Sequence, residues 1–136
     1  SDGVLPITDP RMTRFWITLE QGVDFVLENL ERMLGGEIFV PKIPSMNIMD
    51  LAEVICPDAR IDIVGIRPGE KLNEVMIPKD DARSSLEYDD YYIIKPDFIP
   101  SEKFSGKKVA EDFEYNSGAN PWKLSISEMR EFIGEL

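Results

Sequence analysis

The sequence predicts an α/β fold in which helices cover a small sheet. Between residues 4 and 77 the patterns follow in the order segment, helix, strand, helix, strand and loop, which is typical of helices packed on a sheet. With 136 residues, of which 43% are apolar, the chain can bury the core of one domain. This unit is too short and too irregular for a complete doubly wound domain.

The N-terminal part predicts a short edge segment and then a long helix. Pro6 cannot donate a ladder hydrogen bond, so Val4–Thr8 is expected at a sheet edge. A capping box of Thr18 and Gln21 opens a helix expected to run from Thr18 to Leu34. Gly35 and Gly36 supply its stop signal. Its apolar residues recur at helical spacing and form one face: Leu19, Val23, Val26, Leu27, Leu30 and Leu34.

The middle of the chain continues with a strand, a helix and a second strand. Residues 37–40 read as a short strand, and either Ser45 or Asn47 is expected to cap the helix that follows. Pro57 ends that helix. Residues 61–64 alternate in the manner of a strand, and residues 73–77 continue as a strand or as the end of a short helix.

The C-terminal half contains fewer regular patterns. Residues 79–90 are polar and acidic, which predicts a surface loop, whereas residues 91–94 read as a strand. Residues 97–124 lack periodicity and contain embedded aromatic side chains, so they are expected to wrap over another surface. Ser125 and Glu128 form a capping box for a last helix over residues 125–136.

Composition excludes several classes of function. A net charge of −11 argues against binding to nucleic acid or to an anionic membrane, and no apolar run is long enough to span one. With no histidine and one cysteine, no metal site is expected. Cys56 follows an apolar helical pattern and is expected to be a buried structural thiol. A reducing, cytoplasmic location fits this composition.

The loop Gly65–Leu72 is the strongest candidate site in the chain. It follows a predicted strand, where ligands often bind in α/β folds. Arg67 offers a fork of donors that matches a phosphate, and Glu70 can accept hydrogen bonds from sugar hydroxyls. The alternative is a tight turn whose charges are solvated. The chemistry of the residues leaves both interpretations open.

A second candidate anion site lies nearer the N-terminus. Arg11 and Arg14 precede the aromatic pair Phe15 and Trp16, so they could bind an anion beside an apolar wall. Alternatively, the aromatic side chains enter the core and both arginines are solvated.

One motif match is interpreted as chance. Tyr91 and Lys95 have the Tyr-x-x-x-Lys spacing that short-chain dehydrogenases use for proton transfer from a helix. Here the pattern is that of a strand, on which the two side chains would lie about 13 Å apart. There is no glycine-rich dinucleotide fingerprint, and without histidine no Ser-His-Asp or Cys-His set is possible.

Four separated motifs, in order, resemble the second half of the extended short-chain dehydrogenases/reductases that act on nucleotide sugars. They are Leu5–Trp16, Gly36–Lys42, Gly65–Leu72 and Asp112–Ser117. Together they look most like the inverting UDP-N-acetylglucosamine 4,6-dehydratases of bacterial flagellin and surface-polysaccharide biosynthesis. The resemblance covers essentially the whole chain.

This resemblance implies roles for four residues in substrate binding. The segment that begins at Val4 would lie along the uracil, mainly through its backbone. Arg14 would lie near the diphosphate, Arg67 would bind phosphate, and Glu70 would hold the ribose hydroxyls. No residue of this chain would be catalytic or bind cofactor.

The resemblance further implies that residues 1–136 are the C-terminal nucleotide-sugar-binding portion of a Rossmann-like enzyme. The N-terminal cofactor-binding portion, which would hold NADP, would be the missing partner of this chain. The complete enzyme, expected to be a homo-oligomer, would convert a UDP-sugar to its 4-keto-6-deoxy form with inversion at C5. This chain alone would be inactive. A nucleotide-sugar epimerase or reductase of the same fold is the alternative, and a non-catalytic interaction module is another.

Overall fold

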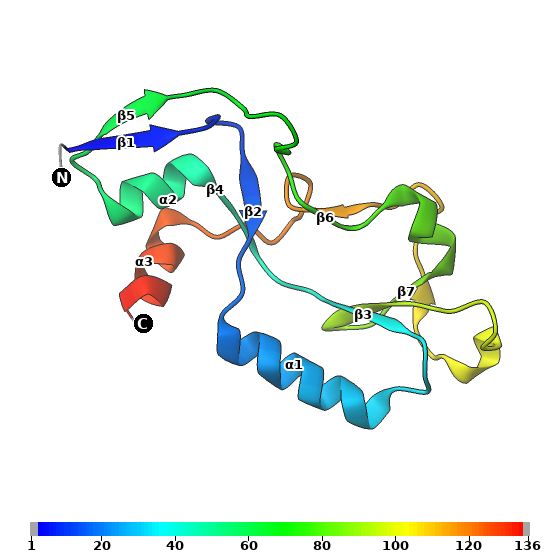
Figure 1. The fold of residues 1–136 in the computed structure, drawn as a ribbon. Coiled ribbons are helices and arrows are strands. Elements are labelled where there is room, and N and C mark those ends of the chain that lie inside the picture. Colours follow the sequence, from blue (N-terminus) through cyan, green and yellow to red (C-terminus); the bar gives the residue numbers. More distant parts are fainter. Residues whose placement is uncertain (1–2, 135–136) are drawn as a thin grey trace. The chain divides into compact units, whose positions relative to one another are not determined.

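The computed structural model describes residues 3–134, and its strands are distributed over four small sheets. The chain divides into two compact units, and Figure 1 shows the course of the chain through their elements. One unit comprises the described residues of 1–16, 44–74 and 117–136, and the other comprises residues 17–43 and 75–116. The predicted α/β class is confirmed, although one small sheet was expected and four are found.

The first unit contains two two-stranded sheets and two helices. Strand β1 (Val4–Ile7) pairs in parallel with β5 (Arg60–Ile63), and β2 (Thr13–Phe15) pairs antiparallel with β4 (Ser45–Asn47). Strands β2 and β4 were not predicted, because three residues are too few to show alternation. The helices of this unit are α2 (Ile48–Ile55) and α3 (Ile126–Gly134).

The caps of these two helices follow the sequence. Of the two candidate caps for α2, Asn47 is the one used: its side chain accepts a hydrogen bond from the backbone N of Met49 at 2.8 Å. The Ser125–Glu128 capping box of α3 is formed, with both hydrogen bonds at 3.1 Å. The core between the helices holds Met46, Leu124 and Met129.

The expectation for Cys56 is wrong, since its side chain is exposed. The helix ends at Ile55, and Cys56 leaves it in a non-helical conformation, with a φ angle of −140°. Its side chain therefore no longer shares the face of α2 that packs on α3. Ile55, at the same end of the helix, is exposed as well.

The second unit contains α1 (Leu19–Arg32), an antiparallel four-stranded sheet and a two-stranded sheet. The larger sheet has the order β3 (Ile38–Pro41), β8 (Tyr91–Ile94), β7 (Ser85–Glu87) and β9 (Lys107–Lys108). The smaller sheet pairs β6 (Val75–Ile77) with β10 (Tyr115–Asn116). Two 3₁₀ helices, Lys79–Ser84 and Ser101–Lys103, complete it.

The prediction of a surface loop at residues 79–90 is wrong. This segment forms a 3₁₀ helix and the strand β7, which lies between β8 and β9. Ala82, Ser85 and Leu86 are all buried. The acidic side chains around them hid the few small and apolar residues that enter the core.

Helix α1 begins as predicted and ends earlier. Both hydrogen bonds of the Thr18–Gln21 capping box are present. The helix was expected to reach Leu34 but stops at Arg32, and Met33 is extended. The cause is Glu37, whose carboxylate accepts hydrogen bonds from the backbone N–H groups of Leu34 and Gly35. These donors would otherwise have continued the helical ladder.

The apolar face of α1 is largely exposed. Leu19 is 86% exposed, Leu30 is 60% exposed and Val26 is 58% exposed. A shallow hollow of about 400 Å³ lies on this face, lined by Leu19, Val23 and Leu27 among others. An amphipathic helix normally packs its apolar stripe on a core. Over the described residues, this stripe has no core to pack on and stays exposed.

Candidate functional site

The candidate site lies at the carboxyl ends of β1 and β5. These strands are parallel, with Val4 opposite Arg60 and Ile7 opposite Ile63, so both end at the same edge. The backbone N of Val64 donates to the carbonyl of Ile7 at 2.9 Å and extends the pairing by one bond. In open α/β sheets, ligands bind outside the carboxyl ends of parallel strands. The loop with Arg67 and Glu70 leaves the sheet from this edge.

Residues 67–70 form a tight turn. The backbone N of Glu70 donates to the carbonyl of Arg67 at 3.1 Å, and Gly69 has a φ angle of 85°. Proline in the second position and a positive-φ glycine in the third are the signature of a type II turn. Pro68 and Gly69 therefore fix the backbone that carries the two charged side chains.

The Arg67 guanidinium of this turn faces solvent, Glu70 is partly buried, and the two charges interact weakly. The Arg67 side chain is 78% exposed, and its Nε lies 3.9 Å from Oε1 of Glu70. The other carboxylate oxygen of Glu70 accepts a long hydrogen bond of 3.5 Å from the backbone N of Arg67. An exposed ion pair of this length contributes little to stability. Both groups can therefore exchange this contact for a ligand.

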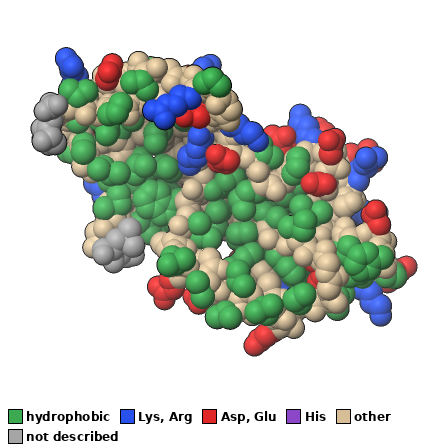
Figure 2. All heavy atoms as spheres, in the orientation of Figure 1, with side chains coloured by type: hydrophobic (Ala, Val, Ile, Leu, Met, Phe, Trp, Pro, Cys, Tyr) green, Lys and Arg blue, Asp and Glu red, His purple; other side chains and the backbone are tan. Residues whose placement is uncertain are grey.

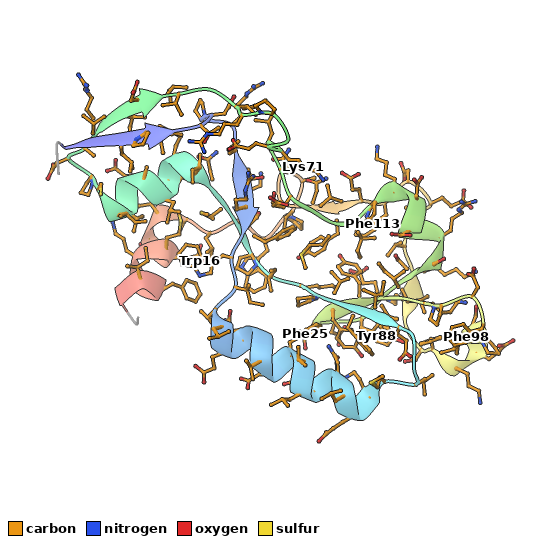
Figure 3. All side chains as sticks on the ribbon, in the orientation of Figure 1. Trp16, Phe25, Lys71, Tyr88, Phe98 and Phe113 are labelled. Carbon is orange, nitrogen blue, oxygen red and sulfur yellow. The ribbon has the colours of Figure 1, made fainter. Side chains whose placement is uncertain are left out.

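The Arg14 side chain is 29% exposed and donates several hydrogen bonds to the protein. Its guanidinium points into the end of the same loop, which Figure 3 marks with the label Lys71. Its two terminal nitrogens donate to the backbone oxygens of Thr13 (2.7 Å), Lys71 (2.9 Å) and Leu72 (3.1 Å) and, weakly, to the Met12 sulfur (3.8 Å). Its Nε lies 3.4 Å from the Glu74 carboxylate and forms an ion pair with it.

Arg11 is also engaged, in this case with a neighbour in the chain. Its Nε and Nη2 donate to the two carboxylate oxygens of Asp9 at 3.0 and 2.9 Å. These side-chain hydrogen bonds lower the pKa of Asp9. Trp16 packs against the core of the first unit, as the second interpretation of this segment expected. The Arg11 side chain is 70% exposed and therefore solvated, as that interpretation supposed, whereas the Arg14 side chain is only 29% exposed.

A buried polar cluster joins β2 to the end of the loop. The Thr13 hydroxyl donates to Oδ1 of Asn73 at 2.6 Å and lies 2.7 Å from the Ser117 hydroxyl. Ser117 is completely buried, and its hydroxyl accepts from the backbone N of Glu74 at 2.9 Å. Gly118 leaves room for Asn73, because a Cβ there would lie 2.7 Å from Oδ1 of Asn73. This cluster was not predicted from the sequence, where Ser117 and Gly118, in an irregular segment, were the only indication of it.

Val4 is not close to the turn along the sheet. It begins β1, three residues before Ile7 at the carboxyl edge, which is a separation of about 10 Å. The side chain of Val4 is 39% exposed. The structure therefore places Arg14, Arg67 and Glu70 at one loop and Val4 at the far end of the neighbouring strand.

The interpretation of Tyr91 and Lys95 as a chance match is confirmed. Tyr91 lies in β8, and its ring stacks on that of Tyr88 with centroids 4.7 Å apart. The Lys95 amine donates to the carbonyls of Pro96 and Ile99, both at 3.1 Å. The sequence also lacks a glycine-rich dinucleotide turn.

Two other tyrosines are structural. Burial, followed by the charge of Glu87, raises the pKa of Tyr92 to about 12. Burial also raises the pKa of Tyr115, whose hydroxyl donates to the carbonyl of Ile43. Both phenols therefore keep their protons near neutral pH and are unsuited to proton transfer there.

Two further classes of site are absent from the part of the chain that the structure describes. Over residues 3–134, the acidic side chains and Cys56 form no group of three or more that could hold a metal ion. None of the helices within that range is long and apolar enough to cross a membrane.

Comparison with known proteins gives a consistent set of relatives. A family model described as polysaccharide biosynthesis protein matches residues 1–96. A UDP-N-acetylglucosamine 4,6-dehydratase (inverting) from Campylobacter jejuni is 52% identical over 139 residues, which cover 95% of this chain and 42% of that protein. A UDP-glucose 4-epimerase from Rickettsia canadensis is 33% identical over 142 residues, covering 95% of this chain and 40% of that protein.

A solved structure supports the fold. The X-ray structure of Pen from Bacillus thuringiensis superposes with a TM-score of 0.81 at 27% sequence identity, and the match covers 98% of this chain and 40% of that one. The chain thus spans about two fifths of the length of the proteins it matches.

Proposed function

This chain belongs to the family of polysaccharide biosynthesis proteins, and we propose that its residues 1–136 are the nucleotide-sugar-binding portion of an inverting UDP-N-acetylglucosamine 4,6-dehydratase. The observation that carries this proposal is the 52% identity to such a dehydratase, which extends over 95% of the chain. The complete protein would then be a lyase that makes a 4-keto-6-deoxy nucleotide sugar for a bacterial surface polysaccharide or glycosylated flagellin.

In this proposal the turn at residues 67–70 holds the nucleotide. The planar guanidinium of Arg67 binds phosphate oxygens through two parallel hydrogen bonds, and the carboxylate of Glu70 accepts from the ribose hydroxyls. The backbone of the strand that starts at Val4 runs along the uracil. Binding energy from the UDP, which does not react, then positions the hexose for chemistry elsewhere.

We assign the cofactor to a separate N-terminal portion. The dehydratase and epimerase relatives are enzymes whose chemistry implies a nicotinamide cofactor, and we propose NADP. When bound, this group supplies hydride transfer. The residues of this chain contribute the grip on the nucleotide. We place the complete enzyme in the cytoplasm, as a homo-oligomer.

The exposed apolar face of α1 supports the proposal that another portion of the complete protein packs on this helix. Figure 2 shows hydrophobic side chains gathered along the surface that α1 forms. The relatives of this chain are more than twice its length, so their remaining residues offer a surface to cover this face. We propose that α1 packs its apolar stripe on the cofactor-binding portion.

The isolated 136-residue chain is therefore expected to self-associate at micromolar concentration, because the apolar stripe of α1 is bare. Replacing Val26 and Leu27 by glutamate should shift the chain toward monomers in sedimentation experiments. The matched control is Glu28→Gln, an exposed residue on the polar side of the helix. A monomeric wild-type chain with a sharp, reversible melt would contradict the proposal for α1.

A second candidate function has the same grip and different chemistry. The similarity to a UDP-glucose 4-epimerase favours a nucleotide-sugar epimerase as the alternative. An epimerase changes one stereocentre and loses no water, so the product separates the two. A non-catalytic interaction module would bind no UDP at all.

Calorimetric titration of UDP into the complete protein and into the isolated chain tests the proposal. We expect binding by the complete protein and no turnover of UDP-N-acetylglucosamine by the isolated chain. Absence of UDP binding by the folded complete protein would overturn the proposal. Sugar turnover by the purified 136-residue chain would contradict the assignment of chemistry to another portion.

A further inference from the structure

The loop with Arg67 and Glu70 is held by hydrogen bonds at its two ends, and the residues between these ends make few contacts with the rest of the protein. At its start, β5 pairs with β1 along four residues, and Val64 adds one more hydrogen bond. From Val64 to Gly69 every residue is exposed. At its end, the carbonyl of Leu72 accepts a hydrogen bond of 2.9 Å from the backbone N of Thr13. The position of the turn therefore depends on what holds residues 71 and 72.

The Arg14 guanidinium holds this end of the loop. It donates to the carbonyl of Lys71 at 2.9 Å through one terminal nitrogen and to the carbonyl of Leu72 at 3.1 Å through the other. Hydrogen bonds from a charged donor are stronger than those between neutral groups. Only a planar fork reaches two successive carbonyls in this way, since a lysine amine acts as a single point. The Arg14 side chain is 29% exposed, so solvent competes little.

We propose that Arg14 is a positioning residue, which grips the carbonyls of Lys71 and Leu72 and so sets the place from which Arg67 and Glu70 meet the nucleotide. Its two terminal nitrogens donate to the carbonyls of Thr13, Lys71 and Leu72, so it acts on the nucleotide through the turn. This inference rests on the proposed function for its consequence in binding, whereas the grip on the loop is independent of any ligand.

A double-mutant cycle in the complete protein separates positioning from direct phosphate contact. With Arg67 present, Arg14→Gln should lower UDP affinity by about tenfold, and Arg14→Lys should restore little of it. In a protein that carries both Arg67→Ala and Glu70→Ala, the same Arg14→Gln change should lower UDP affinity by less than about twofold. The turn then no longer carries the two side chains that Arg14 positions. A full tenfold loss in that background, or full rescue by lysine, would overturn the inference.

Amide hydrogen exchange without ligand tests the grip itself. Arg14→Gln and Arg14→Lys should speed exchange of the Glu70 and Thr13 amides by about tenfold or more, whereas Arg130→Gln on α3 should not. Unchanged exchange at both amides would overturn the inference. If the wild-type protein binds no UDP, the proposed function fails, and the exchange rates still decide the role of Arg14.

Discussion

Arg67→Ala is expected to weaken UDP binding by the complete protein by about 30- to 100-fold. The substitution removes a forked, charge-assisted contact with a phosphate, which corresponds to about 2–3 kcal/mol. Arg67 is 78% exposed and its contact with Glu70 is long, so the fold loses little when it is removed. Titration calorimetry measures the effect, and the melting temperature should stay within about 1 °C of the wild-type value because surface substitutions of this kind change stability little.

Two variants make this result specific. Arg67→Lys keeps the charge but not the fork, so it should recover only part of the affinity. Arg60→Ala removes an exposed arginine from the same β5 arm, at the end far from the turn, and should leave UDP binding unchanged. Equal affinities for wild type and Arg67→Ala would mean that residues 67–70 are only a turn.

Gly118→Ala should have the second large effect, this time on folding. The added Cβ would lie 2.7 Å from Oδ1 of Asn73, which would have to move away from the Thr13 hydroxyl. The free energy of unfolding should fall by about 1–3 kcal/mol, since overpacking of a filled site and the loss of a buried hydrogen bond both cost energy. Denaturant unfolding measures this change. Because Asn73 closes the loop, UDP affinity should fall as well.

The matched control for this substitution, Gly22→Ala, should change stability in the opposite direction. A Cβ at Gly22 in α1 would lie 3.9 Å from its nearest neighbour, Cδ1 of Ile17, which is an ordinary contact. Gly22→Ala should therefore stabilise the chain by up to about 1 kcal/mol through helix propensity. An alanine at position 118 that is tolerated as well as one at position 22 would show that the cluster around Ser117 does not hold the loop.

Features that depend on neighbours in the chain could be predicted from the sequence. The capping boxes at Thr18 and Ser125 form as expected, because each needs only residues three positions apart. The tight turn at residues 67–70 was one of the two interpretations of its loop, and it also rests on neighbouring residues, Pro68 and Gly69. Strand β7 was not, because its pairing with β8 and β9 fixes it and its own three residues carry no pattern. The end of α1 was misplaced because Glu37, outside the helix, takes the donors of residues 34 and 35.

In the candidate site, too, features set by neighbouring residues could be predicted, and features set by distant contacts could not. Arg67 and Glu70 share a turn and were singled out from the sequence. The bonds of Arg14 reach 57 and 58 residues along the chain, and the bond between Thr13 and Ser117 spans 104. No local pattern encodes such distances. Sequence could therefore name Arg14 as a cation near an anion site, but only the fold shows which acceptors surround it.

The reaction of the complete protein with UDP-N-acetylglucosamine in heavy water tests the central claim most directly. Inversion at C5 requires that the bond from C5 to its hydrogen breaks, so solvent deuterium should appear there. Nuclear magnetic resonance of the product should show a 4-keto-6-deoxy sugar, inverted and deuterated at C5. A product that keeps its C6 hydroxyl and differs only in configuration at C4 would contradict the dehydratase account and establish an epimerase in its place.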